Sequence, residues 1–244
     1  MKIHLVNPNT TESMTVKAAE AARKVAAAGT EVVHSQPEYG PVSIEGYYDE
    51  VFAVPGMLDQ IAAFDPTVDG HIIACFDDTG LDAARTIAHG PVVGICEAAL
   101  CTAAMIANSY SVVTTTSRSV PALIHLVHKY GAERRCVNVR ASDVLVLALE
   151  DSTSPARELI EAEIKAAMSE DGAEAIVLGC AGMADLASQL SDQFGLPVID
   201  GVSAAVKQAE ALISQSLLTS RVRGYARPAA KPYSGKFSTY AIED

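Results

Sequence analysis

Short runs of β-branched and apolar residues alternate along the chain with longer Ala-rich stretches in which apolar residues recur every three or four positions. The short runs predict β-strands, and the longer stretches predict amphipathic helices. The expected strands cover residues 2–6, 31–35, 70–74, 91–95, 110–114, 136–141, 173–178 and 197–200. The expected helices cover residues 11–28, 49–63, 80–89, 98–107, 119–130, 155–169, 183–194 and 202–216. Such alternation is typical of parallel sheets covered by helices.

The two halves of the chain repeat each other. An apolar strand runs directly into a cysteine twice, at Cys75 and at Cys180, and a Pro-Val-Val-Gly or Pro-Val-Ile-Asp segment follows each one. The first strand of each half ends in a polar cluster, residues 7–11 in one and 114–119 in the other. We therefore expect an α/β fold of two pseudo-symmetric lobes, each a doubly wound four-stranded parallel sheet flanked by helices.

The repeat also predicts where the lobes and the site lie. Residues 1–96 plus 206–244 are expected to form lobe 1, and residues 97–205 lobe 2. Ligands of doubly wound sheets bind beyond the carboxyl ends of the strands. Both cysteines and both polar clusters follow strands, so the active site is expected in the cleft between the lobes.

Composition narrows the class of protein. The 244 residues carry 18 Lys plus Arg against 30 Asp plus Glu, a net charge of −12, which argues against binding to nucleic acid or to an anionic membrane. No apolar run approaches the roughly 18 residues of a membrane span, and the N-terminal apolar run is too short for a signal peptide. Five cysteines, an odd number with no export signal, make disulfides improbable. We expect a cytoplasmic protein.

Cys75 and Cys180 are the candidate catalytic residues. Taken singly, a cysteine at the end of an apolar strand is more often packing than chemistry. At equivalent positions of two facing lobes, however, the two thiols could remove a proton from one face of a carbon and return one to the other. A helix N-terminus after each cysteine could lower the thiol pKa. Asp77 and Asp78 would oppose this near Cys75; helix capping is their favoured role, and a hydrogen bond to a substrate N–H is the alternative.

The polar clusters leave two roles open. Residues 9–12 have the form of a capping box, so Asn9 either caps the first helix or donates to a developing oxyanion, and the same choice holds for Thr115 and Thr116. Cys96, Cys101 and Cys136 lack symmetric partners and are expected to pack. The six histidines show no metal-ligand spacing, so no metal is expected. The basic C-terminal stretch from residue 219 is expected to lie on the acidic body or on a neighbouring subunit.

Several motifs resemble the aspartate/glutamate racemase superfamily, and within it the hydantoin racemases. They are Leu-Val-Asn-Pro-Asn-Thr at 5–10, Ser-Ile-Glu-Gly-Tyr-Tyr-Asp-Glu at 43–50, Ala-Cys-Phe-Asp-Asp-Thr-Gly-Leu at 74–81, Tyr-Gly-Ala-Glu-Arg at 130–134 and Val-Leu-Gly-Cys-Ala-Gly-Met at 177–183. The sequence departs from the pattern at Thr79, where proline is expected in many relatives.

The resemblance implies a cofactor-independent racemisation of 5-monosubstituted hydantoins at C5, with Cys75 and Cys180 as the two acid/base residues. It also implies substrate contacts from Asn9, Phe76, Thr115, Thr116 and Gly182. The expected partner is a small-molecule substrate, with no nucleic acid and no membrane, and the chain is expected to form a homo-oligomer. The alternatives are an allantoin racemase, another amino-acid racemase of the superfamily, and a two-lobed binding module without chemistry.

Overall fold

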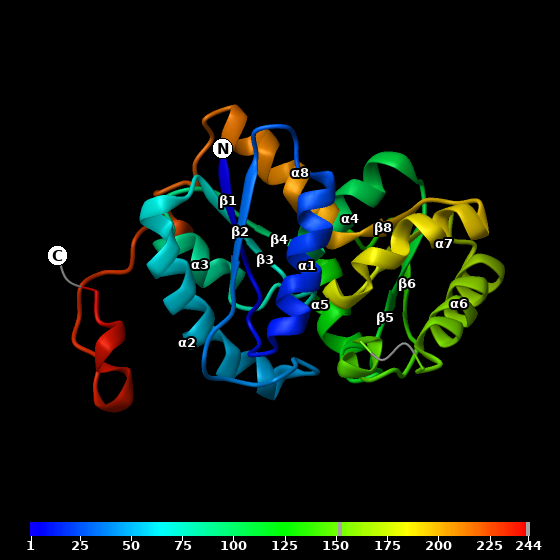
Figure 1. Ribbon diagram of the computed structural model, residues 1–244, viewed down its shortest axis with the longest axis horizontal. Helices are drawn as coiled ribbons and strands as arrows, with labels where there is room; N and C mark the ends of the chain where they lie inside the picture. The colour runs from blue at the N-terminus through cyan, green and yellow to red at the C-terminus, as the bar shows by residue number, and fades with distance from the viewer. Residues whose placement is uncertain (151–152, 243–244) are drawn as a thin grey trace.

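The computed structural model describes residues 1–150 and 153–242, which form two α/β lobes side by side (Figure 1). The first lobe holds the strands β1 (Lys2–Val6), β2 (Glu31–Ser35), β3 (Gly70–Ile73) and β4 (Val92–Gly94), and the second holds β5 (Tyr110–Thr114), β6 (Cys136–Ala141), β7 (Ala175–Leu178) and β8 (Val198–Asp200). The helices are α1 (Glu12–Val25), α2 (Tyr47–Phe64), α3 (Leu81–Ile87), α4 (Ile95–Ile106), α5 (Val120–Lys129), α6 (Ala156–Ala166), α7 (Ala187–Phe194) and α8 (Gly201–Ser214).

Each lobe contains one four-stranded parallel sheet, and the two sheets have the same topology. The strand orders are β2-β1-β3-β4 and β6-β5-β7-β8. In each sheet the second strand lies on one side of the first and the later strands lie on the other side, so the strand order reverses between β1 and β3 in one lobe and between β5 and β7 in the other. Strands β1, β3, β5 and β7 are buried along nearly their whole length, as parallel strands covered on both faces must be. The predicted fold class is confirmed.

Every predicted helix is present, with ends shifted by up to four residues, and three of these differences have an identifiable structural form. Helix α4 begins at Ile95, directly after β4, since a side chain from a distant loop caps it, as described below. The stretch expected as one helix at 155–169 is α6 followed by a π-helical turn, Ala167–Asp171. The stretch expected at 183–194 begins as a 3₁₀ helix, Ala181–Leu186, which leads into α7.

Helices α4 and α8 join the lobes. They pack against each other, and each contacts strands of both sheets: α4 lies against β4, β7 and β8, and α8 against β3, β4 and β8. One buried apolar cluster accordingly contains residues of both lobes, from Ile3 and Leu5 to Val177 and Ile199. The lobes therefore share a core, which holds the carboxyl ends of their strands in a fixed relation. The predicted division into residue ranges stays a prediction.

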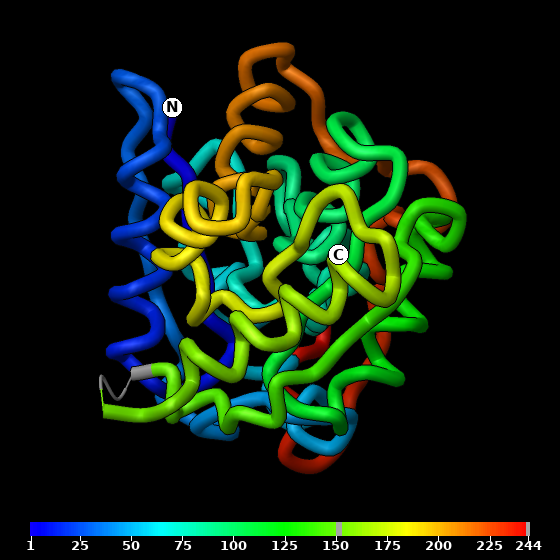
Figure 2. Tube along the Cα trace, turned by 90° about the vertical axis from the view of Figure 1, so that its right-hand side faces the viewer, coloured from blue at the N-terminus to red at the C-terminus, as the bar shows by residue number. Residues whose placement is uncertain are grey.

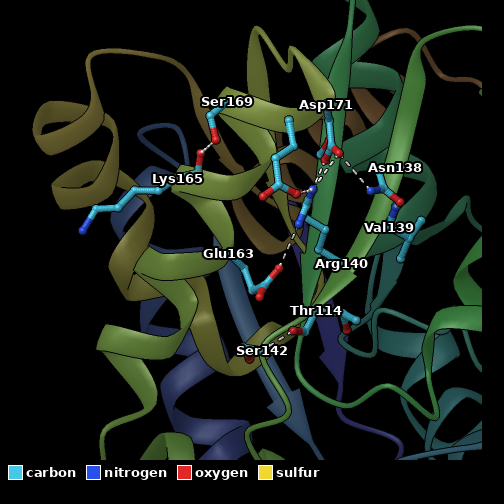
Figure 3. Close-up of polar contacts among 11 residues, drawn as sticks. Thr114, Asn138, Val139, Arg140, Ser142, Glu163, Lys165, Ser169 and Asp171 are labelled. Carbon is cyan, nitrogen blue, oxygen red and sulfur yellow. Dashed lines mark hydrogen bonds and ion pairs between the residues drawn. The ribbon is translucent and has the colours of Figure 1, made fainter.

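The edge strand β6 is held by a cluster of charges around Arg140, the residue before its last (Figure 3). The guanidinium of Arg140 donates to both carboxylate oxygens of Asp171, at 2.7 and 2.8 Å, and also reaches Glu163 and Glu170. These hydrogen bonds lower the pKa of Asp171 to about 2. The cluster connects β6 to α6 and to the π-helical turn and so fixes this edge strand against the helices that cover the second sheet.

After α8 the chain runs along the first lobe towards the opposite end of the molecule (Figure 2, orange to red). Arg221 donates to the carbonyl oxygens of Arg85, Thr86 and Ala88, which lie at the C-terminal end of α3. A cation there satisfies carbonyls that the helix leaves open. The basic stretch thus lies partly on the body of the same chain. Among the described residues no helix is long and apolar enough to cross a bilayer.

Candidate active site

One pocket lies at the carboxyl ends of both sheets, where the strand order of each lobe reverses. This is where doubly wound sheets bind ligands. It holds about 410 Å³ of empty space, part of it open to solvent. Its lining comes from both lobes: Asn9, Met14, Ile44, Ala74, Cys75, Phe76 and Asp77 from the first, and Thr114, Thr115, Ser119, Val146, Gly179, Cys180 and Ala181 from the second.

The two cysteines occupy equivalent places in this pocket. Each follows a buried strand after one intervening small residue, Ala74 beyond β3 and Gly179 beyond β7. The intervening residues pair with the first strand of their own lobe, since the Ala74 N–H donates to Val6 at 2.8 Å and the Gly179 N–H donates to Val113 at 2.8 Å. The repeat seen in the sequence therefore brings both thiols to one pocket, one from each lobe.

Donors around each sulfur differ between the lobes. The Thr79 hydroxyl donates to Cys75 Sγ at 3.4 Å, and the backbone N–H of Asp77 donates to the same sulfur. The sulfur of Cys180 accepts from the backbone N–H of Gly182. These donors favour the thiolate. Thr79, where the family resemblance led us to expect proline, thus supplies a donor that proline could not.

Burial nevertheless raises both thiol pKa values, contrary to the expectation that helix N-termini lower them. Desolvation and the carboxyl of Asp77 raise the pKa of Cys75 well above its usual value. Desolvation and Asp77 likewise raise the pKa of Cys180 to about 11, although Gly182 and Lys17 oppose the shift. The helical segment after Cys180 is a 3₁₀ turn, and α3 begins only at Leu81, so neither thiol lies at the N-terminus of a long helix. Without a ligand, burial therefore favours the neutral thiol in both cysteines near pH 7.

Asp78 is a helix cap, but not of the helix that follows it. Its two carboxylate oxygens accept from the N–H groups of Cys96 and Glu97 at 3.0 Å each, which caps α4, and Tyr130 donates its hydroxyl at 2.7 Å. The N-cap of α3 is Gly80, which makes no side-chain cap. A Cβ on Gly94 would overlap the Asp78 carboxylate. At the matching place in the second lobe, Asp200 caps α8 itself, so Asp78 replaces the side chain that Gly94 lacks.

Asp77 does not cap a helix. Its carboxyl lines the pocket and makes no hydrogen bond with any residue that the structure describes. Burial raises its pKa to about 7, and the carboxyls of Glu50 and Asp78 add to the shift. The capping role favoured for it in the sequence is therefore wrong.

Asn9 is not the N-cap of the first helix either. That position is Thr11, and Asn9 Oδ1 accepts from the Thr11 N–H and from the Asn7 amide, each at 2.9 Å. The nitrogen of the Asn9 amide contacts only the Met14 sulfur, at 3.8 Å. Because a thioether is a weak acceptor, this N–H is available to a ligand.

The expected substrate-binding residues fall into two groups. Asn9, Phe76 and Thr115 line the pocket with both cysteines. Thr116 and Gly182 are buried beside it: Thr116 shares a hydrogen bond with Ser119, and Gly182 acts through its N–H on Cys180.

Three lining residues were not expected from the sequence, because they lie outside the segments that directly follow the strands. Ile44 comes from the loop before α2, Val146 from the segment after β6, and Met14 from the first turn of α1. Only Ile44 lay in a segment already singled out, the family-like motif at 43–50.

The remaining cysteines and the histidines lie outside this chemistry. All five cysteines are free thiols. Within residues 1–150 and 153–242, no group of three or more His, Cys, Asp or Glu side chains could hold a metal ion. His4 and His71 share a hydrogen bond of 3.0 Å inside the first sheet, where burial lowers the pKa of His4 to about 3.

Comparison with known proteins agrees with the geometry. The family model described as Asp/Glu/Hydantoin racemase matches residues 3–209. A hydantoin racemase of Rhizobium meliloti is 53% identical over 96% of this chain and 98% of its own length. The solved allantoin racemase from Klebsiella pneumoniae superimposes with a TM-score of 0.95 at 48% identity, covering 99% of both chains. The aspartate racemase of Picrophilus torridus, at 17% identity and a TM-score of 0.65, shares the fold. The chain therefore belongs to the Asp/Glu/hydantoin racemase family and is an isomerase of the racemase class.

Proposed function

We propose that this protein racemises 5-monosubstituted hydantoins at C5 by a two-base mechanism without a cofactor, with Cys75 and Cys180 as the bases. The observation that carries the proposal is the placement of two thiols, at equivalent positions of two lobes, in one pocket. Two bases from opposite sides are what inversion at a single carbon requires. A binding module would have no use for the pair.

The C5–H of a hydantoin is acidic because it lies next to the C4 carbonyl. In the forward direction one cysteine, as the thiolate, takes the C5 proton, and the electron pair of the C–H bond moves into the ring to give an enolate at O4. The other cysteine, as the thiol, then gives its proton to the opposite face of C5. The first cysteine ends as a thiol and the second as a thiolate, so in the reverse direction the product, which is the opposite enantiomer, meets the two roles exchanged.

The enolate oxygen needs fixed hydrogen-bond donors. The Asn9 amide N–H and the Thr115 hydroxyl line the pocket, and among the described residues neither is committed to a strong acceptor. We assign them to O4. Thr116 and Gly182 act indirectly: Thr116 shares a hydrogen bond with Ser119, and the Gly182 N–H donates to the sulfur of Cys180.

A neutral ring suits the pocket better than a free amino acid. Of the described lining residues, Asp77 alone carries a charge besides any thiolate, and none is Lys, Arg or His. The carboxylate of aspartate or glutamate would therefore meet a like charge and no cation. The superfamily's amino-acid racemases are thus a poorer model for this substrate.

Allantoin is the second candidate, because the solved allantoin racemase matches 99% of this chain at 48% identity. A ureido substituent carries several N–H groups and a carbonyl that need partners. Met14, Ile44, Phe76 and Val146 instead give the pocket an apolar wall. This wall favours an alkyl or benzyl substituent at C5.

The test follows each pure enantiomer of 5-benzylhydantoin, and of allantoin, in deuterated water near pH 7. Loss of the C5 proton is read by NMR and loss of optical rotation by polarimetry, with enzyme-free samples to subtract spontaneous exchange. We expect both signals to change with 5-benzylhydantoin. Allantoin reacting while 5-benzylhydantoin stays inert would reverse the choice of substrate.

Single substitutions separate the two bases. In Cys75→Ala and in Cys180→Ala we expect racemisation to stop, since one face of C5 has no proton donor. The remaining thiolate can still exchange the C5 proton on its own face, so each variant should exchange one enantiomer, and a different one. Cys101→Ala, which changes an exposed cysteine on α4, is the matched control. Unchanged racemisation in either site variant contradicts the mechanism.

A further inference from the structure

The carboxyl of Asp77 is a pocket group that the two-base mechanism leaves without a task. It lies two residues beyond Cys75, lines the pocket beside both thiols, and raises the pKa of each. A charge that hinders ionisation of both bases costs the enzyme activity unless it serves the substrate. Catalysis alone would favour a neutral residue here.

The surroundings leave this carboxyl open towards a ligand. No described residue donates a hydrogen bond to it. Its neighbour Asp78 is fully engaged in capping α4. Glu50, from α2, lies close enough to raise the pKa of Asp77 and has a buried Oε1 without a partner of its own. Two adjacent acidic groups without donors form a site that lacks an N–H or O–H.

A hydantoin ring brings the missing donor. Its ring has two N–H groups and two carbonyls, and the carbonyls suit the donors Asn9 and Thr115. The nitrogen N1 is bonded directly to C5, whereas N3 lies across the ring between the two carbonyls. Because the backbone N–H of Asp77 already contacts Cys75 Sγ, the Asp77 side chain belongs to the same corner of the pocket as the atom that reacts.

We propose that Asp77 binds the substrate by accepting a hydrogen bond from N1–H, so that the pocket selects cyclic ureides with a free N–H beside the reacting carbon. This inference rests on the proposed function. The bond fixes the rotation of the ring in its own plane and thereby keeps C5 between the two sulfurs. It also compensates for the unfavourable effect of the carboxylate on the thiols, because a donor neutralises part of its charge.

A binding experiment tests the proposal without depending on the thiols. 5,5-Dimethylhydantoin has no C5 proton and cannot react, yet it keeps both N–H groups. We expect it to bind the wild-type protein, and its N1-methyl derivative to bind roughly tenfold to a hundredfold more weakly, since a buried acceptor is left unpaired. The N3-methyl derivative is the control ligand and should lose much less. Isothermal titration calorimetry at pH 8 measures all three.

The variant Asp77→Ala should remove the discrimination between the parent and the N1-methyl ligand to within about threefold. Asp77→Asn keeps the shape and one carbonyl acceptor and should retain part of it. Asp192→Ala removes an exposed carboxylate on α7 and controls for net charge. Thermal melting of each variant confirms that it folds.

The same comparison applies to turnover of 5-benzylhydantoin and its N1-methyl derivative. The ratio of the two rates is informative even if Asp77→Ala changes thiol ionisation, because both substrates meet the same thiols. Equal binding of the parent and N1-methyl ligands to the wild type, or undiminished discrimination in Asp77→Ala, overturns the proposal. If no hydantoin binds at all, the proposed function fails instead.

Discussion

The raised thiol pKa values predict that Cys180 reacts slowly with an alkylating agent in the folded protein. Only the thiolate is nucleophilic. A shift of the Cys180 pKa from 9.0 to about 11 lowers its thiolate fraction at pH 7 roughly a hundredfold. The more basic thiolate is intrinsically the better nucleophile, by about sixfold to tenfold for two pKa units. We therefore expect alkylation to be roughly ten to fifteen times slower than for an unperturbed cysteine.

The assay is iodoacetamide labelling of the native protein, stopped at intervals and read for each cysteine peptide by mass spectrometry. The same peptides labelled in urea give the unperturbed rates. Steric shielding would also slow the reaction, but it would leave the pH dependence unchanged. A raised pKa instead makes the logarithm of the rate rise with pH up to at least pH 10. A plateau at or below pH 9 would refute the electrostatic reasoning.

Asp77→Asn measures how much the carboxylate adds to the shift that burial causes in the Cys180 pKa. The wild-type carboxyl has a pKa of about 7, so it is charged and opposes thiol ionisation above pH 7, but is neutral below it. The variant should therefore label Cys180 at the wild-type rate near pH 6 and faster above pH 8, by roughly threefold for each pKa unit that the substitution removes. A ratio that stays constant over this range would show that the carboxylate does not act on the thiol.

Three further outcomes are expected. Asp78→Ala should lower the free energy of unfolding, measured with urea, by about 2–4 kcal/mol, since two backbone N–H groups and a hydroxyl lose their acceptor. In the unfolded chain His4 takes up a proton below its usual pKa of 6.5, but in the folded protein only near pH 3. The free energy of unfolding should therefore fall by up to roughly 1.4 kcal/mol per pH unit as the pH drops between these values. His4→Gln should make the free energy of unfolding depend less on pH in this range. Thr79→Val should slow alkylation of Cys75 but not of Cys180, with Thr79→Ser restoring the rate.

Local patterning was enough to predict the strands and the place of the thiols. All eight strands lie where β-branched runs indicated, and β1, β2, β5 and β6 match to the residue. The repeat located both cysteines because topology alone puts the ends of β3 and β7 at equivalent points of the two sheets. The positions of strands follow from the spacing of apolar residues, and the place of the thiols follows from the order of the strands and helices; both can be read directly from a sequence.

The sequence could not reveal contacts that depend on where a loop folds back. A cap on α4 looks absent, because Gly94 has no side chain and Asp78 lies in another segment. The sign of the thiol shift depends on desolvation, which follows from how the two lobes close over the pocket rather than from the residues next to each cysteine. Ile44 and Val146 reach the pocket because the segments before α2 and after β6 fold back to it.

The two halves of the site are similar but not equal, and thermodynamics limits how far kcat and KM can differ between the two enantiomers. Two enantiomers have the same free energy in water, so under the proposed reaction the values of kcat/KM in the two directions must be equal. The Thr79 hydroxyl on one sulfur, the Gly182 N–H on the other and the single carboxyl of Asp77 break the symmetry of the pocket. They can therefore make kcat differ between the two enantiomers only by the same factor as KM. An enzyme built from a repeat needs two bases in matching places, whereas its donors are free to differ.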